Sequence, residues 1–244
     1  MNELIFYCAG SNKALIYAAA FLTEEGAVFL PCPDQTVTHL LLPVPSFDQD
    51  GSIRGGGDIN AILSQLPKTV TVIGGHLRRP ELAEYEVVDL LEDPWYLARN
   101  ASITAYCTLE LALAKLPVTL EKCPVLIIGW GRIGKCLAKL LRALGACVTV
   151  AARKETHRVM SEALGYQSCP IEKIHTEKYR LIINTVPAMV LPEAPGTALK
   201  IDLASTSGIG GNDVVQAKGL PGLLAPESSG ALIAQTVIQW IKEN

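Results

Sequence analysis

The sequence is poor in aromatic and charged residues and has no long apolar run. Aromatic side chains make up 6% of the 244 residues and charged side chains 18%, whereas 49% are apolar. Disordered chains lack the apolar residues that offset ordering entropy, so this composition predicts a folded globular protein. The longest uncharged stretches, 35–47 and 228–240, have about 13 residues each, fewer than the roughly 18 of a membrane helix. We therefore expect no membrane segment.

The sequence also has no excess of basic residues and no paired cysteines. With 21 basic and 24 acidic residues the net charge is −3, so no nucleic-acid-binding stripe is predicted. The seven cysteines are scattered without a C-x-x-C pair, which excludes a zinc ribbon or a disulfide framework and indicates reduced thiols. Glu3 stands where a signal peptide would carry Lys or Arg. We expect a cytoplasmic protein without a bound metal.

Short apolar runs alternate with helical patterns along the chain. A first series of expected strands comprises 4–8, 27–31, 39–43, 70–74 and 86–90. A second series comprises 125–129, 147–151, 181–186, 198–203 and 222–225. Because continuous apolar strands separated by helices form parallel sheets covered on both faces, the pattern predicts an α/β fold with two lobes.

Two further helices are expected to relate these lobes. Apolar spacing over 94–116 predicts a long interlobe helix. Residues 228–244 have the pattern of an amphipathic helix that Ser228 or Ser229 would cap, and we expect it to return to the first lobe. The predicted domains are therefore 1–100, joined by 228–244, and a dinucleotide-binding domain over 101–227.

The strongest signal is a glycine-rich turn, G-x-G-x-x-G, between an expected strand and an expected helix. In such turns the first glycine permits a tight bend, the second lets the backbone approach a pyrophosphate, and the third lets the helix pack on the strand. The first-turn N–H groups and the helix dipole then face the phosphates. The dinucleotide-binding residues predicted here are Gly129, Trp130, Gly131, Arg132, Ile133 and Gly134.

The same segment matches the phosphate loop G-x-x-x-x-G-K of nucleoside triphosphatases. That motif requires Ser or Thr after the lysine to bind Mg²⁺, whereas Cys136 follows Lys135 here. Because a thiol is a poor ligand for Mg²⁺, dinucleotide binding is favoured. A glycine turn without any ligand is the remaining alternative.

The end of the next strand indicates which dinucleotide binds. A carboxylate there accepts hydrogen bonds from the adenosine ribose, whereas an arginine suits a 2′-phosphate. The residues present are Ala152, Arg153 and Lys154, so NADP is favoured, with NAD possible and a merely solvated basic loop as the alternative. The end of a later strand on the same edge either contacts the nicotinamide side or is only a polar strand end; its residues are Asn184, Thr185, Val186 and Pro187.

Several stretches, taken in order, resemble the family of the dipicolinate synthase A chain. They read LLPVPSFDQDGSI, VIGGHL, NASITAYCTLELAL, VLIIGWGRIGKCLAKLLRALGACVTVAAR, NTVPAMVL, IDLASTSGIGG and GLPGLLAPESSGALIA. The resemblance implies a flavodoxin-like first lobe and a Rossmann second lobe, related to the 2-hydroxyacid dehydrogenases. It also implies oxidation of dihydrodipicolinate to dipicolinate by hydride transfer to NADP, a role in sporulation, and a flavoprotein-like second subunit of the synthase. We further expect a homo-oligomer.

One segment departs from the family pattern. The family's GLPGKVAPKTAG reads GLPGLLAPESSG here, so Leu223 and Glu227 replace basic residues. Positive charges at these places suit a dianionic substrate. Their replacement makes the family's substrate a weaker expectation for this chain than the family's cofactor. With no histidine after His175 to act as a late base, a non-catalytic NAD(P)-binding sensor or scaffold is the alternative function.

Candidates for catalysis and substrate binding come from strand ends and from the family motif. Oxidising a dihydropyridine dicarboxylate requires a hydride acceptor, removal of a ring proton and recognition of two carboxylates, for which arginines, hydroxyls and backbone amides are suited. The expected catalytic residues are His76, Ser205 and Thr206, and the expected residues for the dicarboxylate substrate are Arg78, Arg79, Asn100, Thr104 and Ser207. The alternatives are a structural histidine, solvated arginines, a glycine–serine turn and helix caps at Asn100 and Thr104.

Overall fold

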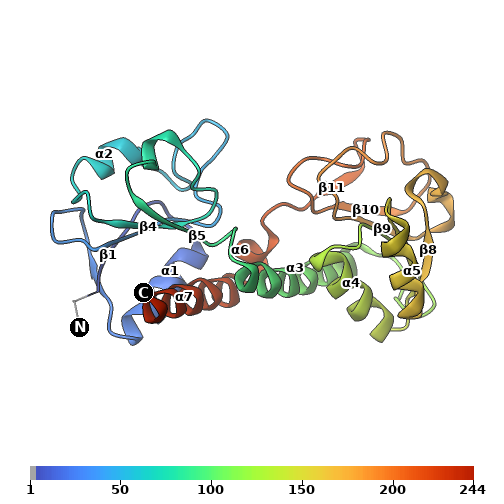
Figure 1. Cartoon of the computed structure of the whole chain (residues 1–244). Helices are drawn as coiled ribbons and strands as arrows, with labels where there is room; N and C mark the ends of the chain where they lie inside the picture. The colour runs from blue at the N-terminus through green and yellow to red at the C-terminus, as the bar shows by residue number, and fades with distance from the viewer. Residues whose placement is uncertain (1–3) are drawn as a thin grey trace. The chain divides into compact units, whose positions relative to one another are not determined.

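The computed structural model describes residues 4–244, which form two compact units, each built on its own parallel sheet (Figure 1). The first unit contains the chain up to residue 100 together with 221–244, and the second contains residues 101–220. The expected α/β class, with a flavodoxin-like sheet and a Rossmann sheet, is confirmed by the strand orders of the two units.

The first unit has a five-stranded parallel sheet in the order β2-β1-β3-β4-β5, which is the order of flavodoxin-like folds. Its strands are β1 (Ile5–Cys8), β2 (Val28–Leu30), β3 (His39–Leu41), β4 (Thr71–Gly74) and β5 (Glu86–Asp89). The connections contain α1 (Lys13–Glu24), α2 (Ile59–Leu63) and the 3₁₀ helix η1 (Pro80–Leu82). Strand β4 is buried along its whole length, which explains its continuous apolar run.

The C-terminal helix α7 (Pro226–Glu243) packs against α1 of the first unit. Gly230 lies where the two helices cross: a Cβ there would be 2.6 Å from the Ala14 carbonyl oxygen and 2.8 Å from the Ala18 nitrogen. Only a residue without a side chain permits this approach of the two backbones. Towards the other end of α7, the Trp240 ring meets the His39 ring edge to face at 6.3 Å.

The expected cap of α7 at Ser228 or Ser229 is wrong. The helix begins two residues earlier, at Pro226, with Ala225 as its N-cap residue. Proline suits the first helical position because an N–H group at that position would have no acceptor within the helix, so its absence removes no hydrogen bond. Ser229 lies within the helix with its hydroxyl buried.

The second unit has a six-stranded parallel sheet in the order β11-β10-β9-β6-β7-β8. Its strands are β6 (Pro124–Ile128), β7 (Cys147–Ala151), β8 (Gln167–Cys169), β9 (Leu181–Asn184), β10 (Leu199–Asp202) and β11 (Val214–Gln216). When the strands are numbered 1–6 from β6 and the sheet is read from its β8 edge, the order is 3-2-1-4-5-6, which is that of a Rossmann fold. Its connections contain α4 (Arg132–Ala143), α5 (Glu155–Ala163) and the 3₁₀ helices η2 (Ile171–Lys173) and η3 (Thr176–Lys178).

Three expectations about secondary structure differ from the observed elements. β8 and β11 were not predicted, because they are edge strands of three residues each and no continuous apolar run marks them. The strand expected at 222–225 is wrong, since helix α6 (Leu220–Leu224) occupies most of this segment. Leu223 is 69% exposed, so the apolar residues here are not buried as they would be in a sheet.

Helix α3 (Pro94–Lys115) begins well before Asn100 and Thr104. Asp93 precedes it, and the Tyr96 N–H donates to Asp93 Oδ1 at 2.6 Å. The alternative that Asn100 or Thr104 caps this helix is therefore wrong, because both lie in its interior. Although α3 has 22 residues, neither it nor another helix within residues 4–244 has the length and apolar character needed to cross a membrane.

Replacing Gly230 with alanine is expected to lower the free energy of unfolding by about 1–3 kcal/mol, because the new Cβ would overlap the backbone of α1. Urea denaturation measures this change. Gly222→Ala in α6 is the matched control, since a Cβ there would meet no atom within 4 Å and alanine favours a helix. Equal losses in both variants would contradict the close helix crossing.

Candidate functional site

In the second unit the strand order reverses between β6 and β9, which pair side by side. Ligands of open α/β sheets bind outside the carboxyl ends of the strands at such a point. A cavity of about 630 Å³ lies at this edge, within the roughly 300–1,000 Å³ typical of small-molecule sites. The predicted cofactor residues that line it are Gly129, Trp130, Gly131, Ala152, Arg153, Lys154, Thr185, Val186 and Pro187.

Each glycine of the turn after β6 has its own local environment. Gly129 has a φ of +105°, and a Cβ there would overlap the Thr185 hydroxyl oxygen. A Cβ on Gly134 would overlap the carbonyl oxygen of Gly129, so the helix lies directly against the turn. A Cβ on Gly131 would meet no atom within 4 Å. Two glycines therefore shape the turn, and the third leaves its backbone open.

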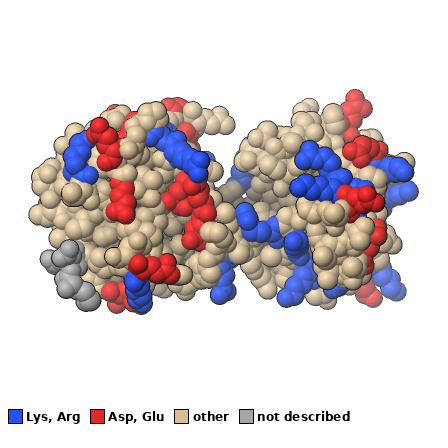
Figure 2. Space-filling view, viewed as in Figure 1, with Lys and Arg blue, Asp and Glu red and all other residues tan. Residues whose placement is uncertain are grey.

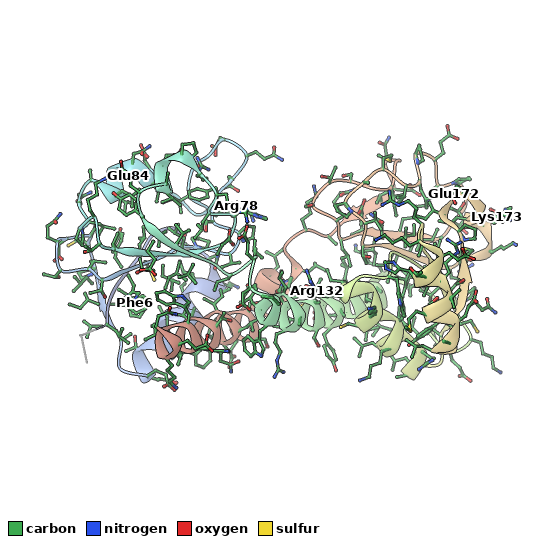
Figure 3. The ribbon with its side chains drawn as sticks, in the orientation of Figure 1. Phe6, Arg78, Glu84, Arg132, Glu172 and Lys173 are labelled. Carbon is green, nitrogen blue, oxygen red and sulfur yellow. The ribbon has the colours of Figure 1, made fainter. Side chains whose placement is uncertain are left out.

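Helix α4 starts from this turn with unpaired backbone donors. Its N-cap residue, Gly131, has no side chain to cap the helix, and the N–H groups of Arg132, Ile133 and Gly134 have no acceptor in the described part of the chain. Such donors and the helix dipole favour an anion. Figure 3 labels Arg132 at this end of α4. Arg132, Ile133 and Gly134, which were predicted to bind the dinucleotide, are not among the residues that line the cavity.

Trp130 adds an orphaned donor beside the glycines. Its side chain is buried, its ring packs edge to face on Tyr166 at 5.6 Å, and its Nε1 has no hydrogen-bond partner among the described residues. Buried polar groups without a partner are rare in folded proteins. The open Gly131 and the free amides of α4, which lie beside this residue, fit a site for the diphosphate of a dinucleotide.

The turn after β7 brings basic side chains to the same cavity. Arg153 and Lys154 line it, and Arg158 Nη1 fixes the turn by donating to the carbonyl oxygens of Ala152 at 2.8 Å and Arg153 at 2.9 Å. Arg153 and Lys154 themselves have no ion-pair partner among residues 4–244. Figure 2 shows basic groups beside acidic ones on the visible face of this unit.

The sequence did not predict several lining residues. His157 lies in the first turn of α5, Ile171 and Glu172 come from η2, and Ala188, Met189 and Val190 follow β9. His157 lies three positions after Lys154, one turn into the expected helix, so this spacing could have predicted that it lines the same cavity. Ile171 and Glu172 follow β8, which has no apolar pattern, and for them no local signal exists.

Asn184 does not line the cavity, although it was expected to contact the cofactor. Its amide nitrogen donates to Asp202 Oδ1 at 2.8 Å and to the Val186 carbonyl at 3.0 Å, and its oxygen accepts from the Val186 N–H at 3.0 Å. Asn184 is fully buried. It therefore fixes the chain that follows β9, and thereby the cavity wall at residues 186–190.

Asp202, at the end of β10, holds this wall from the other side. Its Oδ1 also accepts from the Ala204 N–H at 3.1 Å, and its Oδ2 accepts from the N–H groups of Gly208 at 2.7 Å and Ile209 at 3.1 Å. The Gly208 carbonyl in turn accepts from Val190 and Leu191. A buried carboxylate with this many N–H donors needs no cationic partner.

Ser205, Thr206 and Ser207 lie in the loop that Asp202 organises. Ser205 and Thr206 are exposed, and the Ser207 hydroxyl donates to Gln216 Oε1 at 3.3 Å. None of the three lines the cavity. The loop that carries them follows the carboxyl end of β10.

The candidates in the first unit are engaged in local contacts. His76 has a φ of +61°, which is uncommon for a residue other than glycine. Its N–H donates to Asp89 Oδ1 at 3.1 Å, and the Leu77 N–H donates to Asp89 Oδ2 at 2.8 Å, so the carboxylate that ends β5 fixes this turn. The His76 side chain is exposed.

Both candidate arginines of this unit already have acidic partners. Arg78, labelled in Figure 3, pairs with Glu92 at 2.6 Å and is 84% exposed. Arg79 pairs with Glu81 at 2.9 Å and lies over the Phe47 ring at 4.1 Å. The Arg79 guanidinium lowers the pKa of the Glu81 carboxyl through their hydrogen bond. Asn100 and Thr104 both belong to α3.

Together the strand orders, the glycine turn and the cavity define a two-unit α/β protein whose second unit has a Rossmann-type fold. No protein-family model matches the chain. The A chain of dipicolinate synthase of Bacillus subtilis (strain 168) is 29% identical over 179 residues, which span 66% of this chain and 59% of that relative.

Two solved structures have the same fold along nearly the whole chain. The A chain of dipicolinate synthase from Bacillus subtilis has a TM-score of 0.80 and 23% identity, covering 100% of this chain and 97% of that one. Its counterpart, the dipicolinate synthase A chain from Bacillus halodurans, has a TM-score of 0.81 and 22% identity, covering 98% and 97%. The resemblance to the family of the dipicolinate synthase A chain is thereby confirmed.

Replacing Asp202 with asparagine is expected to cost about 2–3 kcal/mol of folding free energy, because the amide would turn N–H groups towards the donors of Gly208 and Ile209. Nucleotide affinity should fall as well, since the wall at residues 186–190 loses its anchor. Urea denaturation and nucleotide titration measure the two effects. Glu177→Gln, at an exposed carboxylate of the same unit, should change neither.

Proposed function

We propose that the chain is an NADP-dependent oxidoreductase that oxidises dihydrodipicolinate to dipicolinate, acting as the A chain of a dipicolinate synthase. The observation that carries this proposal is the cavity at the β6–β9 edge, where the open backbone of Gly131 and the basic side chains of Arg153 and Lys154 meet. The confirmed family resemblance supports an oxidoreductase, and the name of the relatives supplies dipicolinate as the product.

In this proposal the nucleotide lies along the edge of the second sheet. The α4 amides hold the diphosphate, and Arg153 and Lys154 hold a 2′-phosphate. Residues 185–187 lie against the nicotinamide side. The nicotinamide, when bound, supplies the hydride acceptor.

The substrate residues complete the proposal. In the second unit, the candidate donors to a carboxylate of the substrate are the hydroxyls of Ser205, Thr206, Ser207 and Thr104. In the first unit, the candidates are Asn100, the two arginines Arg78 and Arg79, which would exchange Glu92 and Glu81 for a carboxylate, and His76 as the base. We also propose that the chain forms a homo-oligomer and works with a flavoprotein-like second subunit of the synthase, in the cytoplasm of a sporulating cell.

Turnover tests this function directly. The chain is incubated with dihydrodipicolinate and NADP, with and without the second subunit, and NADPH formation is followed by absorbance. Formation of NADPH together with dipicolinate is the expected result. Nucleotide binding without any hydride transfer under either condition would favour the alternative function, a non-catalytic NAD(P)-binding sensor or scaffold, which the exposure and ion pairing of the substrate candidates support.

Replacing Gly131 with leucine is expected to abolish NADP binding and leave the fold intact. Its φ of −84° suits any residue, and no atom lies within 4 Å of its Cβ position, so the side chain would fill only the open space at the turn. Calorimetric titration measures binding, and circular dichroism verifies folding. Gly222→Leu, at an equally open glycine of the first unit, should bind normally. Unchanged affinity in Gly131→Leu would place the diphosphate elsewhere.

Replacing Arg153 with aspartate is expected to weaken NADP binding about tenfold and to favour NAD, because a carboxylate repels the 2′-phosphate and accepts from a ribose hydroxyl. Arg158 bonds the backbone of residue 153, so the turn itself should persist. The NAD affinity of the same variant is the internal control. An unaltered ratio of the two affinities would mean that other groups hold the phosphate.

A further inference from the structure

Four ionisable side chains line the cavity from two neighbouring segments. Arg153 and Lys154 come from the β7–α5 connection, His157 comes from the first turn of α5, and Glu172 comes from η2. Among residues 4–244, the Glu172 carboxylate makes neither an ion pair nor a hydrogen bond with another side chain. Arg78 and Arg79 of the first unit, in contrast, are both ion-paired. One acidic and three basic side chains thus line one cavity without forming an ion pair with one another.

Backbone pairing explains why this acid reaches the cavity. Ala151 of β7 lies opposite Cys169 of β8, and the Ala152 N–H donates to the Cys169 carbonyl at 3.1 Å. The segments that follow β7 and β8 therefore leave the sheet side by side. Glu172 follows within a 3₁₀ turn that is closed by the bond from the Lys173 N–H to the Pro170 carbonyl at 3.0 Å. Glu172 and Lys173 are both labelled in Figure 3.

The end of β7 has no carboxylate, the group that accepts from the adenosine ribose in many NAD sites. Glu172 supplies one to the same cavity from η2, which follows the adjacent strand β8. Its charge has opposite consequences for the two nucleotides: it accepts hydrogen bonds from free ribose hydroxyls, and it repels a 2′-phosphate that Arg153 and Lys154 attract.

We propose that Glu172 is a specificity-determining residue of the nucleotide site. It lowers the ratio of the NADP affinity to the NAD affinity, so that the chain also binds NAD. This inference rests on the proposed nucleotide-binding function and specifies which adenosine dinucleotides the site takes. Glu172 is exposed, so solvent screens its charge and its effect on each affinity is a few-fold rather than several orders of magnitude.

The test compares Glu172→Gln with wild type by titrating the full chain with NADP and, separately, with NAD. The variant is expected to bind NADP about fivefold more tightly and NAD about fivefold more weakly, because glutamine removes the charge and keeps the shape. The gain for NADP should shrink at high salt, as for any exposed charge. Lys173→Gln is the matched control: it lies in the same 3₁₀ turn but does not line the cavity, so the ratio of the two affinities should stay as in wild type.

The outcomes separate this inference from the proposed function. If wild type binds nucleotide and Gly131→Leu does not, but Glu172→Gln keeps the wild-type ratio of affinities, Glu172 has no role in specificity and only this inference fails. A parallel rise or fall of both affinities also overturns it. If neither nucleotide binds wild type, the proposed function fails and this inference fails with it.

Discussion

The close contact between the turn after β6 and the residue after β9 is the constraint on which the second unit depends. Gly129 leaves no room for a side chain against Thr185, whose hydroxyl donates to the Ile128 carbonyl at 2.9 Å. Gly134 lies against Gly129 in the same way. Because no side chains separate these segments, α4 starts directly at the sheet edge and its unpaired amides face outward. A larger residue at either position would move the helix and the strand apart.

Buried hydrogen bonds keep the rest of this edge in place. Asn184 and Asp202 end neighbouring strands and bond to each other, so the loops after β9 and β10 act as one structure. The cavity wall depends on these two residues although neither faces the cavity. Substitutions there would reach a bound nucleotide only through the backbone, which distinguishes them from changes at Arg153 or Gly131.

Local sequence patterns predicted the parts of the site that are continuous in the chain. The spacing of Gly129, Gly131 and Gly134 and the two bases after β7 could be recognised because each depends on residues a few positions apart. Glu172 could not, because β8 is too short and too polar to mark the strand that positions it. The bond between Asn184 and Asp202 joins residues 18 positions apart, so it becomes visible only once the strand order is known.

The return of α7 to the first unit has a consequence for how the chain folds during synthesis. Residues 101–220 are contiguous, so the second unit has all its strands and helices once that stretch has left the ribosome. The first unit has its sheet earlier, but the face of α1 that meets Gly230 stays uncovered until α7 emerges. The first unit therefore begins to form first and is completed after the second. Until then, the uncovered face of α1 is an exposed surface to which chaperones could bind on the nascent polypeptide.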